Sequence, residues 1–200
     1  MNTNCKKFEA IVIGSSAGGI KALNILLSAL PKKFPLPIII VQHLHPNSNS
    51  YLVNIFQSVC QLPVKQADEK EKIIQSTVYV APPNYHLLIE EDCSFSLSLE
   101  ERVNFSRPSI DVLFETAAYA YWNQLIGIVL TGANQDGSRG LKKIKQQGGY
   151  AIVQDPDTAE ADTMPKAAIA MTPVDKILTI KAITPHLLQL LNLPELPETT

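Results

Sequence analysis

The sequence predicts an α/β fold, in which a doubly wound, mostly parallel sheet is flanked by helices and a short antiparallel hairpin region is added. Continuous runs of β-branched and apolar residues, such as 10–14 and 37–42, have the composition of buried strands. Segments with helical spacing of apolar residues separate these runs, which favours parallel strands joined by right-handed crossovers. The length of 200 residues suits one domain. We expect that domain to cover residues 1–193, and residues 194–200 to form a flexible tail.

The N-terminal elements are predicted in the order strand, tight turn, helix and strand. The strand at 10–14 ends in a glycine and leads into the turn 15–19. Apolar residues then recur at helical spacing over 20–30, until a proline ends the helix. The next buried strand, at 37–42, is expected to lie beside the first strand and parallel to it.

The middle of the chain has weaker patterns. A helix is predicted at 51–60, and the charged residues 65–76 are interpreted as a solvated surface connection. Short, partly alternating segments separated by turn signals predict an antiparallel hairpin set. These segments are 77–80, 86–89 and 95–99.

The C-terminal half returns to alternating helices and strands. The best amphipathic pattern in the chain covers residues 110–121, and Ser109 is placed to cap the start of that helix. Further elements are predicted as strands at 125–130 and 150–153, a helix at 138–147 and a closing helix at 185–191.

Composition excludes several classes of protein. The formal net charge of −2 lacks the basic excess of a phosphate-backbone binder, so we expect no nucleic-acid partner. The longest apolar runs are far shorter than a membrane span of about 20 residues, so we expect no membrane insertion. The 3 cysteines form neither a disulfide framework nor a CxxC pair, and the N-terminus has no apolar stretch of secretory length. These features favour a cytoplasmic location.

Serine, histidine and aspartate residues follow three of the predicted buried strands, at the point where each strand ends. Ser15 and Ser16 follow the first strand, His43 and His45 follow the second, and Asp136 follows the third. Ligands and catalytic groups gather outside the carboxyl ends of parallel strands. We therefore expect these side chains on one rim of the sheet.

These residue types suit nucleophilic catalysis. Ser16 is the candidate nucleophile, because a tight turn holds its hydroxyl out of the backbone and the amides of the following helix start can stabilise an oxyanion. His43 is the candidate general base, since an imidazole can take and return the serine proton at neutral pH. Asp136 is the candidate carboxylate that fixes the imidazole and stabilises its charged form.

Each of these residues also has a simpler interpretation. Ser16 and Asp136 are residue types that cap helices, and His43 is compatible with a structural hydrogen-bond network. The turn 14–19 is compatible with phosphate binding, although it is neither GxGxxG nor followed by GK[ST]. His43 and His45 alone are too weak a pair to predict a metal site. The coincidence of three suitable residues on one rim favours catalysis.

Ordered segments along nearly the whole chain resemble the catalytic domain of chemotaxis protein-glutamate methylesterases. The family motifs are an IG-small-S-small-GG turn, a QH strand end, an AP…H segment, an SRPSVDVLF stretch, an LTGMGxDG turn and a late MP segment. The matching segments are Ile13-Gly14-Ser15-Ser16-Ala17-Gly18-Gly19, Val41-Gln42-His43, Val80-Ala81-Pro82-Pro83-Asn84-Tyr85-His86, Ser106-Arg107-Pro108-Ser109-Ile110-Asp111-Val112-Leu113-Phe114, Leu130-Thr131-Gly132-Ala133-Asn134-Gln135-Asp136-Gly137 and Met164-Pro165.

The resemblance implies a serine hydrolase with Ser16 as nucleophile, His43 as general base and Asp136 as the residue that orients it, which agrees with the assignment from chemistry. It implies hydrolysis of glutamate methyl esters, and deamidation of glutamine, on the helical cytoplasmic region of chemoreceptors. The implied partners are methylated chemoreceptor helices and a separate receiver or methyltransferase protein. Neither a cofactor nor a metal is implied.

For this hydrolase, we expect the backbone N–H groups of Ala17 and Ala133 to hold the oxyanion. Arg107 is a candidate for orienting acidic neighbours on the substrate. Its alternative role is a salt bridge that anchors the helix following Ser109.

The sequence departs from the family pattern in two ways. Ala133 and Asn134 stand where the family often has methionine and glycine, which changes the pocket near the oxyanion and leaves substrate preference open. Many family members carry a receiver domain before the esterase domain, and 200 residues leave no room for one, so we expect a stand-alone catalytic domain. The alternative functions are a non-catalytic binding module that holds a signalling helix on the same rim, and a nucleotide-binding fold.

Overall fold

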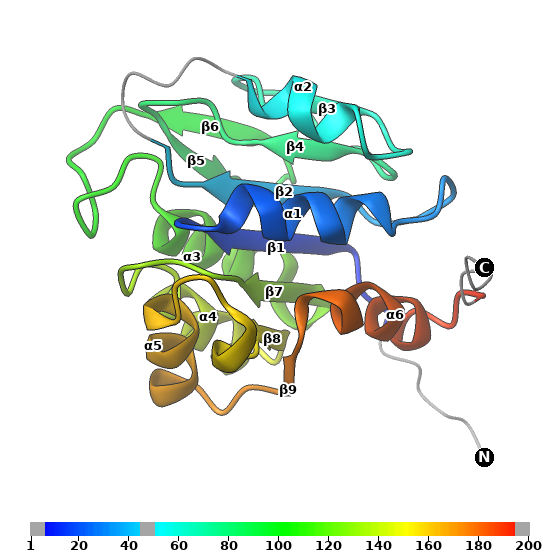
Figure 1. Cartoon of the computed structure of the whole chain (residues 1–200). Coiled ribbons are helices and arrows are strands. Elements are labelled where there is room, and N and C mark those ends of the chain that lie inside the picture. Colours follow the sequence, from blue (N-terminus) through cyan, green and yellow to red (C-terminus); the bar gives the residue numbers. More distant parts are fainter. Residues whose placement is uncertain (1–6, 45–50, 195–200) are drawn as a thin grey trace.

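The centre of the molecule is one parallel sheet of 7 strands in the order β3-β4-β2-β1-β7-β8-β9 (Figure 1). The computed structural model describes residues 7–44 and 51–194. The strands of the main sheet are β1 (Ala10–Ser15), β2 (Ile38–Gln42), β3 (Val64–Gln66), β4 (Val78–Val80), β7 (Leu125–Val129), β8 (Tyr150–Gln154) and β9 (Lys176–Leu178). A second, antiparallel sheet pairs β5 (His86–Ile89) with β6 (Phe95–Ser98). The predicted α/β class is confirmed.

Helices cover both faces of the main sheet. They are α1 (Gly19–Ser28), α2 (Leu52–Gln57), α3 (Ile110–Tyr121), α4 (Ser138–Gln146), α5 (Thr163–Met171) and α6 (Ile180–Leu190), with short 3₁₀ helices at Trp122–Gln124 and Pro156–Thr158. Alternate residues of β1 enter different cores, because successive side chains of a strand point to opposite faces. Ile11 and Ile13 belong to the core with α1 and α6, whereas Ala10 and Val12 belong to the core with α3, α4 and α5.

The sheet is doubly wound about β1 and β7, which are neighbours at its centre. The chain leaves β1 through α1 toward β2, and it leaves β7 through α4 toward β8, in the opposite direction. Since α1 and α4 pack in different cores, the two connections diverge at the carboxyl ends of β1 and β7. In doubly wound sheets, this point of divergence is where a ligand crevice forms.

The structure corrects two expectations for the middle of the chain. Residues 64–66 form the edge strand β3 instead of a solvated connection, and Ala67 beside it is fully buried. Residues 78–80 join the main sheet as β4, parallel to β2 and β3, so the antiparallel hairpin contains only β5 and β6. Strands of three residues are too short to show a periodic pattern, and their pairing depends on distant partners.

The C-terminal region contains α5 and β9, which the sequence pattern did not indicate. In addition, α6 begins at Ile180 and contains Pro185, whereas a helix starting at the proline was expected. An interior proline removes one helical hydrogen bond. Packing of Ile183, Leu187 and Leu188 in the core compensates for that loss. Residues 195–200 of the predicted tail lie outside the described residues.

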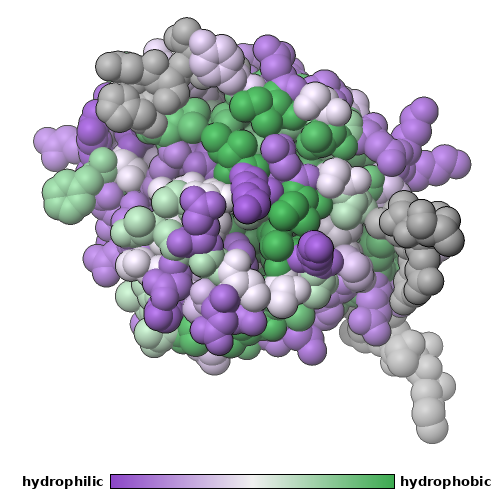
Figure 2. All heavy atoms as spheres, viewed as in Figure 1, coloured by the Kyte–Doolittle hydropathy of each residue, from purple (hydrophilic) through white to green (hydrophobic). Residues whose placement is uncertain are grey.

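On the face formed by α1 and α6, hydrophobic side chains reach the surface in patches between hydrophilic ones (Figure 2). Within the described ranges, no helix combines the length and the apolar character needed to cross a membrane.

Candidate active site

The three candidate catalytic residues lie at the carboxyl edge of the sheet, each after a different strand. Ser16 directly follows β1, and His43 directly follows β2. Asp136 lies in the loop between β7 and α4. The site therefore occupies the crevice at which the sheet reverses its winding. His45, the other histidine considered for this rim, lies outside the described residues.

Gln42 joins the turn after β1 to the end of β2. Its buried amide donates from Nε2 to the carbonyl oxygens of Ser16 (2.9 Å) and His43 (2.7 Å). Its Oε1 accepts a hydrogen bond from the hydroxyl of Ser15 at 2.7 Å. Gly19 makes room for this contact, because a Cβ at that position would overlap Oε1. The backbones of Ser16 and His43 are therefore held side by side.

The adjacent serines differ in what their hydroxyls do. Ser15 is fully buried and donates to Gln42, whereas Ser16 is half-buried and lines an open groove of about 950 Å³ along α1. Among residues 7–44 and 51–194, the Ser16 hydroxyl has no hydrogen-bond partner. Only Ser16 thus presents a hydroxyl that a substrate can reach.

His43 lines two hollows of the surface. One is the open groove that contains Ser16, and the other is a smaller hollow of about 100 Å³ lined by the chain at 102–108. The Nε2 atom of His43 lies 2.9 Å from Oδ2 of Asp136. Nδ1 is therefore the nitrogen left to take a proton from Ser16. In the serine-protease triad, the two nitrogens have the opposite assignment.

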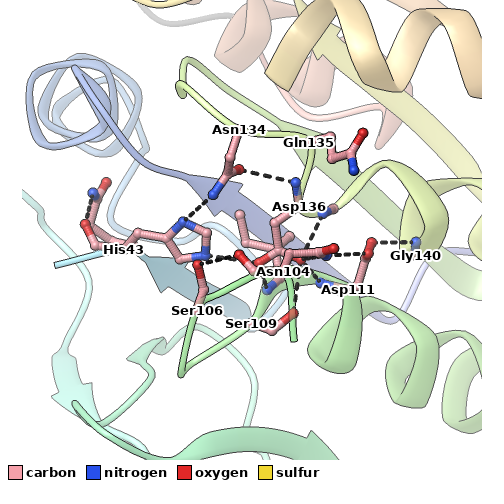
Figure 3. Close-up of polar contacts among 12 residues, drawn as sticks. His43, Asn104, Ser106, Ser109, Asp111, Asn134, Gln135, Asp136 and Gly140 are labelled. Atoms are coloured by element: carbon pink, nitrogen blue, oxygen red, sulfur yellow. Dashed lines mark hydrogen bonds and ion pairs between the residues drawn. The ribbon is translucent and has the colours of Figure 1, made fainter. Parts of the chain in front are cut away.

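The contacts of the His43 imidazole with Asp136 and Asn134 favour the same tautomer. The main-chain N–H of Asp136 can only donate, and it donates to Oδ1 of Asn134 at 3.0 Å, so the amide must turn Nδ2 toward the imidazole (Figure 3). Nδ2 lies 3.4 Å from Nδ1 of His43, and an amide N–H there favours an unprotonated Nδ1. Nε2 then carries the hydrogen and donates it to Asp136. This tautomer leaves on Nδ1 the lone pair that a general base requires.

The carboxylate of Asp136 occupies the N-terminus of α3. It is only 1% exposed, and it accepts hydrogen bonds from the N–H groups of Ile110 (2.7 Å) and Asp111 (3.0 Å). Ser109 stands at the predicted cap position, but its hydroxyl donates to Asp136 at 2.8 Å and does not itself cap the helix. The unpaired N–H groups and the dipole of a helix start favour a negative charge, which a distant loop supplies here.

This network controls the ionisation of Asp136. Burial by itself would raise the pKa of the carboxyl, because the charged form loses its hydration. Hydrogen bonding and attraction to His43, together with the hydrogen bonds from the Ile110 N–H and from Asn104, outweigh burial and hold the pKa below its usual value. Asp136 is therefore ionised at neutral pH and can stabilise a protonated His43.

Asn104 links Asp136 to a second buried carboxylate, that of Asp111. Its Nδ2 donates to Oδ1 of Asp136 at 2.8 Å and to Oδ2 of Asp111 at 2.9 Å. Asp111 also accepts from Nε of Arg139 (3.0 Å) and from the N–H of Gly140 (2.8 Å), which ties α3 to α4. Sequence reasoning did not assign a role to Asn104 or Asp111. The only signal for Asp111 was its place in the family-like stretch.

The expected oxyanion donors, Ala17 and Ala133, lie on the loops that follow β1 and β7. The loops are joined, because the N–H of Ser16 donates to the Thr131 carbonyl at 3.0 Å and the Thr131 hydroxyl donates to the Ala17 carbonyl at 2.8 Å. Both alanines are exposed. Across the described ranges, neither of their N–H groups has a backbone acceptor. These amides are available to a ligand, and their role stays a prediction.

Arg107 has contacts that the sequence did not indicate. Its Nη1 donates to the carbonyl oxygens of Leu99 (2.7 Å) and Glu100 (3.0 Å), so it fastens the chain that leads to α3. The alternative role, a salt bridge to that helix, is not among its contacts with the described residues. Arg107 also lines the smaller hollow beside His43, and binding of acidic substrate groups there stays a prediction.

His86 is a buried histidine whose contacts hold the start of α3. It is 2% exposed, its Nδ1 accepts from the N–H of Ser109 at 3.2 Å, and its Nε2 contacts the Glu101 carbonyl at 3.0 Å. It therefore positions the start of α3, which in turn holds Asp136. In the part of the chain that the structure describes, no three His, Cys, Asp or Glu side chains gather as metal ligands would.

Comparison with known proteins gives one consistent result. The model of the family described as CheB methylesterase matches residues 11–187. A Leptospira interrogans protein, named provisionally as a protein-glutamate methylesterase/protein-glutamine glutaminase, is 57% identical over 176 residues, which cover 88% of this chain and 91% of the relative. A Carboxydothermus hydrogenoformans protein, named protein-glutamate methylesterase/protein-glutamine glutaminase 1, is 38% identical over 180 residues. That match covers 88% of this chain and 53% of the relative, so the chain spans about half of its length.

A solved structure extends the similarity to the fold. The crystal structure of the Thermotoga maritima CheB methylesterase catalytic domain superposes with a TM-score of 0.88 and 34% sequence identity. The superposition covers 92% of this chain and 99% of that domain.

Proposed function

The chain belongs to the CheB methylesterase family, and from this premise we propose that Ser16, His43 and Asp136 form its catalytic triad. The chain is a protein-glutamate methylesterase/protein-glutamine glutaminase, the activity for which its relatives are named. The proposed substrates are methylated glutamates, and glutamines, on the cytoplasmic helices of chemoreceptors. The observation that carries the triad is the contact between Nε2 of His43 and the ionised Asp136, beside the turn that presents Ser16.

The first half of the proposed reaction forms an acyl-enzyme. The Ser16 hydroxyl attacks the ester carbonyl while Nδ1 of His43 takes its proton, which gives a tetrahedral intermediate and an imidazolium. Asp136 stabilises that imidazolium through Nε2. The N–H groups of Ala17 and Ala133 hold the oxyanion, each for a contribution of about a hundredfold in rate. The C–O bond to the methoxy group then breaks, Nδ1 returns the proton to the leaving oxygen, and methanol departs.

The second half regenerates the enzyme. A water molecule attacks the glutamyl ester of Ser16, and Nδ1 of His43 takes one of its protons. When the second tetrahedral intermediate collapses, the proton passes to the oxygen of Ser16, and the substrate leaves as a glutamate carboxylate. With glutamine as substrate, the same steps release ammonia in place of methanol.

The domain bounds, the location and a further partner are proposed from the family and from the sequence expectations. We propose that residues 1–193 make up the catalytic domain, that it acts in the cytoplasm, and that a separate receiver or methyltransferase protein is a partner. Co-purification of the folded chain with methylated receptor fragments tests whether the chain binds them.

The decisive experiment measures methanol release from methylated cytoplasmic fragments of chemoreceptors. Wild-type protein and Ser15→Ala should release methanol, because the Ser15 hydroxyl is occupied by Gln42, whereas Ser16→Ala should not. Loss of activity in Ser15→Ala alone, per folded molecule, would reassign the nucleophile. A folded wild-type chain that releases no methanol would favour the non-catalytic binding module.

A further inference from the structure

The turn at 103–106 carries an aromatic side chain into solvent beside the candidate site. Val103 and Ser106 exchange two backbone hydrogen bonds of 3.2 and 2.9 Å, and the residues between them, Asn104 and Phe105, have left-handed φ angles of 51° and 61°. This is the pattern of a type I′ turn, whose central positions favour glycine and asparagine. The second position nevertheless holds Phe105, which is 96% exposed. A bulky apolar residue held in a strained conformation and in water points to a function.

The turn is fixed to the catalytic machinery on both sides. Asn104 donates to the buried carboxylates of Asp136 (2.8 Å) and Asp111 (2.9 Å), and Figure 3 shows Asn104 and Ser106 beside His43. The guanidinium of Arg107, just after the turn, holds the carbonyl oxygens of the preceding residues 99 and 100. The turn that carries Phe105 is therefore tied to the same carboxylate, that of Asp136, which the His43 imidazole contacts.

The surroundings of the ring combine apolar and cationic groups. Phe105 and Arg102 line the smaller hollow that also contains His43. Arg102 is exposed, and it makes no ion pair with any residue in 7–44 or 51–194. An aromatic side chain next to an unpaired arginine is the composition of a binding hot spot for an acidic, amphipathic partner.

We propose that this turn is the docking element for the substrate helix, with Phe105 packing against apolar side chains of the helix and Arg102 pairing with its carboxylates. The inference rests on the proposed function and adds to it the residues that select the helix. The reaction itself converts a neutral ester into a carboxylate, so a helix with several modified positions becomes more acidic as it is processed. Carboxylates three or four residues from the reacting ester lie on the same helix face, where Arg102 can meet them.

The test compares steady-state methanol release from a methylated receptor fragment by wild-type protein and Phe105→Gly. Glycine adopts the left-handed conformation without strain, so this variant removes the ring and keeps the turn. We expect KM to rise about tenfold, the effect of losing one binding hot spot, with kcat within about twofold and no loss of thermal stability. Phe105→Tyr should retain the wild-type KM.

Trp122→Gly provides the matched control. Trp122 is also an exposed aromatic residue with a left-handed φ of 51°, but it follows the opposite end of α3. We expect it to leave KM unchanged. If Phe105→Gly leaves KM unchanged or lowers only kcat, the docking role is wrong. Methanol release by the wild type would still support the proposed function. A folded wild-type chain without methanol release overturns both.

Arg102→Gln tests the charged half of the inference. The variant should raise KM, and its KM should depend less on salt than that of the wild type, because salt screens exposed charge pairs. A salt dependence equal to that of the wild type would remove Arg102 from the docking element.

Discussion

The two sides of the candidate site are built in opposite ways. On the side of α3, the carboxylate of Asp136 is buried and receives hydrogen bonds from His43, Asn104 and the start of the helix. On the side of α1, Ser16 is half-buried and lines an open groove. The fold therefore completes the acid–base half of the site in advance and leaves the nucleophile half to the substrate. Catalysis by preorganised charge requires the first property, and bond formation requires the second.

The substitution Asp136→Asn removes the charge of the buried carboxylate and has the largest expected effect. An amide cannot accept all the hydrogen bonds that the carboxylate accepts, and it carries no charge to stabilise a protonated His43. We expect activity to fall about ten-thousandfold. The free energy of unfolding should fall by about 3–5 kcal/mol, the usual cost of removing one partner from a buried pair. Methanol release and urea unfolding measure the two losses, and wild-type stability in this variant would contradict the role of the carboxylate in holding α3.

Low pH should lower the free energy of unfolding of the wild type through protonation of Asp136. The pKa of Asp136 is lowered in the folded protein, so the folded state binds its proton less readily than the unfolded chain does. The stability from this group is fully present above the ordinary aspartate pKa of about 3.9 and is lost as pH falls from there toward the folded-state pKa. Urea unfolding at a series of pH values should therefore show a steeper acid loss for wild type than for Asp136→Asn. Parallel curves would contradict this assignment.

Substitutions of the adjacent serines should affect stability in the reverse order of their effects on activity. Ser15→Ala leaves the buried Oε1 of Gln42 without its donor and should lower the free energy of unfolding by about 1–3 kcal/mol. Ser16→Ala removes a hydroxyl from an open groove and should change it by less than about 0.5 kcal/mol. Urea unfolding of both variants tests the contrast. Greater destabilisation by Ser16→Ala than by Ser15→Ala would contradict the claim that the Ser16 hydroxyl faces an open groove.

The smallest effect is expected at Asn134, which orients the imidazole from the margin of the site. Asn134→Ala should lower kcat about fivefold, the equivalent of one hydrogen bond of about 1 kcal/mol, with KM unchanged. Asn134→Asp has nearly the same shape but offers Nδ1 of His43 an acceptor in place of a donor, so its loss should be larger. Equal losses in the two variants would mean that Asn134 acts through packing alone.

The sequence predicts the three candidate catalytic side chains better than the hydrogen-bond network that holds Asp136. Ser16, His43 and Asp136 were assigned to one rim because each follows a buried strand, and the structure has them there. The network around Asp136 had no such signal, since its donors include the main-chain N–H groups of residues 110 and 111, which any residue type supplies. The contact between Asn134 and the His43 imidazole also had no signal, because it depends on how closely two loops approach each other.

The elements of the fold also differ in how well the sequence predicts them. Long, strongly patterned elements such as β1, β2 and α3 were predicted close to their observed bounds, because burial of one face imposes a period on the sequence. The edge strand β3 and the parallel placement of β4 were missed, because three residues carry no period and their partners are distant in the sequence. Local sequence rules place a helix start at the proline of α6, because they do not include the packing that tolerates a proline inside the helix.

Nitrogen NMR of His43 tests most directly whether the fold prepares the base before the substrate arrives. The protein is labelled with ¹⁵N-histidine and measured at a pH where the imidazole is neutral. The signal is assigned by its absence in His43→Gln, and the buried His86 serves as an internal reference. We predict a single tautomer with hydrogen on Nε2, facing Asp136, and a bare Nδ1 on the side of Asn134. Hydrogen on Nδ1, or a mixture of tautomers, would contradict the claim that the fold prepares the base before the substrate arrives.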